Sequence, residues 1–116
     1  MNRQIEEILG DLTVDGQHIP VTFLYYEGHG EPYVTYMEES KSNSLTGDDE
    51  LVGYVSYYDF DIYSKGNFLP ICEAVRSALE AHGWVWQLSR SSEDMYEPDT
   101  GYYHKTMNFA ILREEN

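Results

Sequence analysis

The sequence predicts one α+β domain: a mostly antiparallel sheet of about five strands, with one main helix packed on one face and a short N-terminal helix. Three observations carry this prediction. One long segment repeats its apolar residues with the helical period, several segments alternate apolar and polar residues as strands do, and the strand-like segments lie on both sides of the main helix. The 116 residues fit a single domain of ordinary size, spanning 1–116.

The first helix is expected over residues 2–9, where Ile5, Ile8 and Leu9 share one side and Gly10 follows as a stop signal. The main helix is expected within 66–83. Asn67 is its predicted cap, Pro70 lies in its first turn and Gly83 ends it. Its core stripe is expected to consist of Phe68, Ile71, Cys72, Val75 and Leu79.

Two strands are expected before the main helix, at 18–26 and 33–39, and the turn residues of 27–32 predict that they pair as a hairpin. The polar stretch 40–50 is interpreted as a long exposed loop. Residues 51–65 give the longest strand signal. One face, predicted to line the core, holds Tyr54, Ser56, Tyr58, Phe60 and Ile62; the other, facing solvent or a partner, holds Val55, Tyr57, Asp59, Asp61 and Tyr63.

After the main helix, residues 84–89 predict a strand with Trp84, Trp86 and Leu88 on one face. A second exposed loop is expected at 90–101, before a final strand at 102–114. The apolar face of that strand is predicted to hold Tyr103, Met107, Phe109 and Ile111, interrupted by Lys105, and its other face His104, Thr106, Asn108 and Ala110.

Charge is the strongest compositional signal. Twenty-one acidic against seven basic residues give a formal net charge of −14, so the chain repels phosphates and is not expected to bind nucleic acid. The single cysteine, Cys72, excludes an internal disulfide, which fits a reducing compartment. Neither a signal peptide nor a membrane span is expected, because no apolar run is long enough.

Two groups of residues have the chemical types of an active or metal site. Glu97, Asp99 and His104 suit acid–base chemistry, but no Ser or Cys accompanies them in a recognised motif. Asp59 and Asp61 share a strand face and, with Glu38 or Glu39, are of the type that holds a divalent cation, although a solvated polar face is the commoner outcome of this pattern. We therefore expect no enzyme activity, no metal and no cofactor.

Three stretches, "PYVTYMEE" (32–39), "YYDFDIYSKGN" (57–67) and "MYEPDTGYYHKTMNFAI" (95–111), together resemble the small tail-completion or tail-terminator proteins of long-tailed bacteriophages and prophages. The resemblance covers roughly residues 18–112, and the N-terminal helix is shorter than in such proteins. It implies a non-enzymatic ring, commonly of six subunits, that caps the tail tube and docks head-completion proteins. The implied partners are copies of the chain itself, the tail tube protein and a head completion protein, in the virion and, during assembly, in the host cytoplasm.

A cyclic ring needs two different patches on each subunit, because its contacts are heterologous. Candidate interface residues come from the two predicted loops and the tyrosine-rich outer strand face: Asp48, Asp49, Glu50, Tyr57, Tyr63, Tyr96, Asp99 and Tyr102. The alternative left open by the charge is a small acidic inhibitor, either an immunity protein that covers a basic toxin or a DNA mimic.

Overall fold

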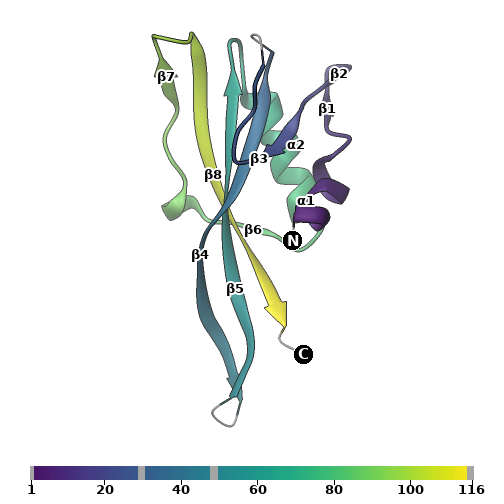
Figure 1. The fold of residues 1–116 in the computed structure, drawn as a ribbon, viewed down its shortest axis with the longest axis vertical. Helices are drawn as coiled ribbons and strands as arrows, with labels where there is room; N and C mark the ends of the chain where they lie inside the picture. The colour runs from purple at the N-terminus through teal and green to yellow at the C-terminus, as the bar shows by residue number, and fades with distance from the viewer. Residues whose placement is uncertain (1, 29–30, 48–49, 115–116) are drawn as a thin grey trace.

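The computed structural model describes residues 2–28, 31–47 and 50–114, and the side chains within these ranges except those of 43–52 and 114. It is an α+β fold with two helices, a six-stranded sheet and a separate two-stranded ribbon (Figure 1). The molecule is elongated, with extents of 52 × 26 × 22 Å. The domain class and the mostly antiparallel sheet were predicted, but the number of strands was too low.

The N-terminal part forms α1 (Asn2–Leu9) and then the ribbon of β1 (Thr13–Val14) and β2 (Gln17–His18). Helix α1 packs against the core through Ile5 and Leu9, which confirms the predicted apolar side. The ribbon turns at Asp15 and Gly16, both at positive φ, and Asp-Gly is a preferred pair for a tight two-residue hairpin.

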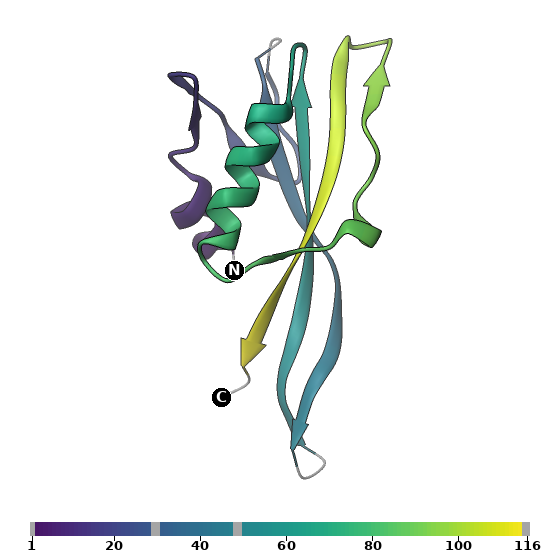
Figure 2. The same ribbon diagram turned by 180° about the vertical axis from the view of Figure 1, so that it is seen from behind.

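The main sheet has the strand order β3-β4-β5-β8-β6, with β7 also paired to β8. Its members are β3 (Val21–Phe23), β4 (Tyr33–Gly47), β5 (Glu50–Ser64), β6 (Val85–Trp86), β7 (Met95–Glu97) and β8 (Tyr102–Glu114). Helices α1 and α2 (Leu69–Glu80) lie together on one side of it, seen from behind in Figure 2. We call the face of the sheet toward α2 the inner face and the opposite one the outer face.

The core lies between the inner face and the helices. Every residue of the predicted stripe of α2 is buried, as are Tyr58, Phe60 and Ile62 of the predicted inner face of β5. The N-cap of α2 is Phe68, without a side-chain cap, so the prediction of Asn67 as the cap is one residue off. Asn67 Oδ1 still accepts the backbone N–H of Leu69, over 3.1 Å, from the position before the cap. Gly83, at φ 88°, ends the helical segment as predicted, in a conformation that favours glycine.

The hairpin predicted for 18–26 and 33–39 is wrong. Pro20 separates β2 from β3, and β3 pairs with β4 in parallel, with Val21 opposite Val34. Segment 24–32 therefore does not make a tight reversal between antiparallel neighbours. Because β3 and β4 run in the same direction, β4 begins at the same end of the sheet as β3.

The long loop predicted at 40–50 is also wrong. Strand β4 continues through it to Gly47, and β5 begins at Glu50, so the two form one long antiparallel hairpin. The pairing shifts register between Glu38 and Ser40 and again near Leu45. Polar residues hide this extension because strand periodicity is visible only where one face is buried. We call its outer part, residues 40–47 and 50–57, the arm; it projects beyond the helices (Figure 1).

The segment after α2 differs from the prediction as well. Strand β6 has only two residues, and the chain then forms the short 3₁₀ helix η1 (Leu88–Arg90) before β7. Trp84 is buried, whereas Leu88, expected on the same face, is 72% exposed because η1 breaks the alternation. Loop 90–101 is thus partly a strand. Tyr103, predicted on the apolar face of β8, is exposed, while Met107 and Phe109 are buried as expected.

Candidate functional site: the outer face of the sheet

The outer face of β5 and β8 carries matched pairs of polar side chains. The antiparallel register places Asp59 opposite Asn108, Asp61 opposite Thr106 and Tyr63 opposite His104. Residues directly opposite one another have side chains on the same face, close enough to touch. The period of two that buries Phe60 and Ile62 on the inner face therefore gathers these polar groups on the outer one.

Each of these carboxylates has a hydrogen-bond donor. The Asn108 Nδ2 group donates to Asp59 Oδ1 over 2.8 Å, and the Thr106 hydroxyl donates to Asp61 Oδ1 over 2.5 Å. Burial raises the pKa of Asp59 above its ordinary value, with Asp61 and Glu39 adding repulsion, while the bond from Asn108 opposes the shift. The two aspartates thus link β5 to β8, and the Oδ1 atom of each already accepts a hydrogen bond within the protein.

His104 lies between two carboxylates on different ring nitrogens. Its Nε2 is 3.3 Å from Asp61 Oδ1, and its Nδ1 is 3.6 Å from Glu97 Oε2. Because the two acids face opposite nitrogens, they do not converge with the ring on one point where a cation would sit. In the described part of the chain, no group of three or more His, Cys, Asp or Glu side chains is arranged to hold a metal ion.

The candidate acid–base group is brought together only in part. Glu97 and His104 meet, but Asp99 lies in the exposed turn between β7 and β8. Two hydroxyls lie beside this group: that of Thr100 donates to Glu97 over 3.2 Å, and that of Thr106 donates to Asp61 and not to the imidazole. Covalent catalysis needs a nucleophile hydrogen-bonded to a base, and a third group that orients the base. Among the described residues, no such set is assembled around His104.

An aromatic stack crosses the outer face beside these polar pairs. The Tyr63 ring lies between Tyr33, with centroids 4.6 Å apart, and His104, 4.2 Å away, both nearly parallel to it. Tyr102 meets Tyr33 and Tyr63 edge-on. Burial raises the pKa of Tyr63 to about 12. Both faces of this ring are already covered, so it offers its edge and not a stacking platform to any partner.

The segment from Gln87 to Ser92 covers the next part of the outer face. Arg90 places its guanidinium 3.8 Å from the Tyr57 ring centroid, and its Nη1 lies 3.0 Å from Glu39 Oε2 on β4. The hydroxyl of Ser91 accepts a bond from the backbone N–H of Asn108 over 3.0 Å. This segment explains why Asn108 is fully buried although it belongs to the outer face.

The predicted interface residues are distributed over three places. Tyr57, Tyr63 and Tyr102 lie on or beside the outer face, half-buried, while Tyr96 and Asp99 are exposed in the β7–β8 hairpin. Gly101, at φ 77°, donates its N–H to Glu97 O over 2.8 Å and so closes that hairpin. Asp48 and Asp49 lie outside the described residues, and only the backbone of Glu50, which begins β5, is described.

Sequence reasoning missed Arg90, Glu39 and the Ser91 hydroxyl as organisers of this face. They are far apart in the chain, 51 residues in the case of Arg90 and Glu39, and no local pattern links them. One signal existed: an arginine in a polar segment is suited to lie on an aromatic ring, and the strand at 51–65 offered tyrosines on its outer face.

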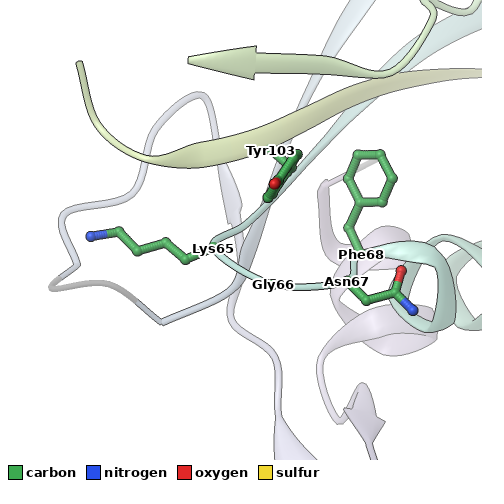
Figure 3. Close-up of a pocket in the computed structure, with 5 residues that line it drawn as sticks. All are labelled: Lys65, Gly66, Asn67, Phe68 and Tyr103. Atoms are coloured by element: carbon green, nitrogen blue, oxygen red, sulfur yellow. The ribbon is translucent and has the colours of Figure 1, made fainter. Parts of the chain in front are cut away.

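A hollow of about 420 Å³ lies at the N-terminal end of α2, lined by Lys65, Gly66, Asn67, Phe68 and Tyr103 (Figure 3). Figure 3 shows the Lys65 side chain extending away from the Phe68 and Tyr103 rings. None of the acid–base candidates lines the hollow; its side chains are one lysine, one amide and two aromatic rings. These residues make no pairing of a base with a nucleophile, so the hollow does not support catalysis.

A scan against protein-family models and a search of curated proteins both gave no match. No helix in the described residues is long and apolar enough to cross a membrane. The resemblance to phage tail proteins therefore remains an expectation based on the motifs of the sequence.

Proposed function

We propose that this chain is a structural protein of a bacteriophage or prophage that forms a ring at the head-proximal end of the tail tube. The ring ends tube growth and joins the tail to the head, as in the tail-terminator proteins that the sequence resembles. The observation that carries the proposal is the arm of residues 40–47 and 50–57, which extends past the helices. Strand β8 pairs with β5 as far as Gly53, and beyond that point the tip of the arm is a two-stranded hairpin. Two strands alone are marginally stable in water, so this tip gains stability by lying against another chain.

The charge and the outer face agree with this role. A net charge of −14 repels the phosphates of a genome that moves through the tube, which favours passage without sticking. The polar groups of His104, Asp61 and Glu97 face one another, which is an arrangement suited to holding a hairpin in place. The partners we propose are six or so copies of the chain, the tail tube protein and a head completion protein, in the virion and in the host cytoplasm during assembly.

The β7–β8 hairpin is the proposed contact to a neighbouring subunit, through Tyr96, Asp99 and Tyr102. Tyr96 is 53% exposed and touches only the Tyr103 ring among the described aromatic residues, with centroids 4.8 Å apart. We expect Tyr96→Ala to weaken assembly, measured by native mass spectrometry. It should lower the free energy of unfolding of the monomer by no more than about 0.5 kcal/mol.

Glu73→Ala, on the exposed face of α2, is the matched control and should assemble like the unmodified chain. If Tyr96→Ala assembles as well as this control, the hairpin is not the subunit contact.

The alternative function, a small acidic inhibitor of a basic protein, is favoured by the net charge alone. A DNA mimic presents free carboxylates across one face, spaced like phosphates. On this outer face Glu39 is paired with Arg90, and Asp59 and Asp61 with neutral donors. Stoichiometric inhibition of a basic nuclease that weakens steeply with added salt would support the inhibitor over the ring.

A further inference from the structure

The β3 strand covers only the beginning of the β4 edge. It pairs with β4 over three residues, ending with Phe23 opposite Tyr36. The Leu24 N–H then donates to Tyr36 O over 3.0 Å, and the Tyr25 N–H donates back to Phe23 O over 2.9 Å, with Leu24 at φ 71°. This is a γ-turn at a bulky residue, a strained conformation that turns the chain away from the sheet.

As a consequence, the edge of β4 from Met37 onward is open on the side away from β5. No described strand pairs with it there. Such an edge presents unpaired N–H and C=O groups, which are a template for another strand.

A second open edge lies on the opposite side of the sheet. Strand β6 pairs with β8 only at Phe109 and Ala110, and β7 pairs only near Tyr102, so Ile111–Arg113 has β5 alone as a partner among the described strands. Through β5, Leu112 is level with Ser42 of β4. The two open edges thus occupy the same level of the sheet, clear of β3 and β6, and both strands run in the same direction because each is antiparallel to β5.

We propose that Ile111–Arg113 of one copy pairs in parallel with the β4 edge of the next copy, within Met37–Gly47, so that the sheet continues around the ring. The inference rests on the proposed ring and names its subunit contact. The occupant is a second copy because the chain carries both halves of the contact, one on each side of the sheet. Such a contact is heterologous and repeats head to tail, as cyclic closure requires.

The side chains at the two edges are complementary in kind. On the outer face, Leu112 is 51% exposed at one edge and Met37 is 42% exposed at the other. On the inner face, Arg113 has a buried Nε with no hydrogen-bond partner among the described residues. At the opposite edge Glu38 has a partly exposed carboxylate, 3.4 Å from the Lys41 ammonium group. These contacts need Leu112 beside Met37 and Arg113 beside Glu38, five residues along β4 from the positions level with them, Ser42 and Asn43. In that register the pairing offers an apolar contact on one face and opposite charges on the other.

The β4 edge also carries features that restrict what pairs with it. Glu39 lies at a register shift between Glu38 and Ser40, and Lys41 is exposed beside it. Bulges and charges on an edge discourage indiscriminate pairing. An edge restricted in this way selects a strand that brings its own arginine and leucine, as the end of β8 does.

Hydrogen–deuterium exchange followed by mass spectrometry tests the pairing. The chain is measured as a dilute monomer and as the assembly purified at high concentration with magnesium, which relieves repulsion between acidic subunits. We expect backbone amides in 37–42 and 111–113 to exchange at least tenfold more slowly in the assembly, while those of α2 stay unchanged. Met37→Lys and Leu112→Lys should each reduce assembly, whereas Val85→Lys, at an exposed position on β6, should not.

The outcomes separate the two proposals. A ring in which both segments exchange as fast as in the monomer overturns the edge pairing and leaves the ring standing. A chain that forms no ring at any concentration overturns the proposed function and the pairing with it. A ring that tolerates lysine at both Met37 and Leu112 also counts against the pairing.

Discussion

Replacing Trp84 by alanine tests where the core ends and η1 begins. Trp84 is 2% exposed and meets the Tyr58 and Phe60 rings edge-on, with centroids 5.6 and 5.8 Å away. Truncating a buried tryptophan to alanine costs about 3–5 kcal/mol through lost burial and the cavity left behind. An unfolding entropy of about 2.1 cal/mol/K per residue over 116 residues makes the expected decrease in Tm about 12–20 °C.

The matched control is Leu88→Ala, four residues further along the chain. The sequence pattern places Leu88 on the same face as Trp84, but in the structure it is 72% exposed in η1. Its truncation should change stability by no more than about 0.5 kcal/mol. Both values are read from thermal and urea unfolding curves. Equal losses for the two variants would mean that β6 continues through Leu88 and that the break at η1 is wrong.

Three further predictions concern single groups. Burial raises the pKa of the Cys72 thiol to about 11, so at pH 8 it should react with a thiol reagent only after unfolding, and fast labelling of the native chain would contradict its place in the core. Asp59 has a raised pKa when folded, so its contribution to stability is present at acidic pH and is lost as the pH rises through that pKa. In urea unfolding, Asp59→Asn should therefore be more stable than the unmodified protein at pH 7 and lose that advantage near pH 4. An Asp59→Asn protein that is less stable at pH 7 would refute this. Gly83→Ala places a side chain at φ 88°, and should lower the free energy of unfolding by about 1 kcal/mol, whereas Gly66→Ala, at an uncrowded position, should cost less.

The sequence predicted those parts of the fold in which one face is buried. In α2 the apolar stripe is buried as expected, because burial imposes the helical period on the side chains, and Gly83 ends the helical segment as predicted. The two faces of β5 were likewise assigned correctly. The Asp15-Gly16 turn of the ribbon is a strong local signal that sequence reasoning did not use.

The arm and the parallel β3–β4 pairing could not be predicted in this way. Residues 40–47 form a strand because they pair with β5, and their polar sequence carries no alternating pattern from which the strand could be recognised. The parallel pairing depends on the turn at Leu24, a residue type that gives no turn signal. The Arg90 contacts with Tyr57 and Glu39 are long-range and follow from the tertiary fold alone.

Native mass spectrometry of the purified chain over a concentration series, with and without magnesium, tests the proposed ring most directly. One subunit has a mass of 13.5 kDa, so a closed ring of six has a mass of about 81 kDa by cyclic symmetry. A discrete species near this mass that dissociates in the Tyr96→Ala variant is the result the account predicts. A monomer under every condition would contradict the ring, and tight, salt-sensitive inhibition of a basic nuclease would then favour the acidic inhibitor.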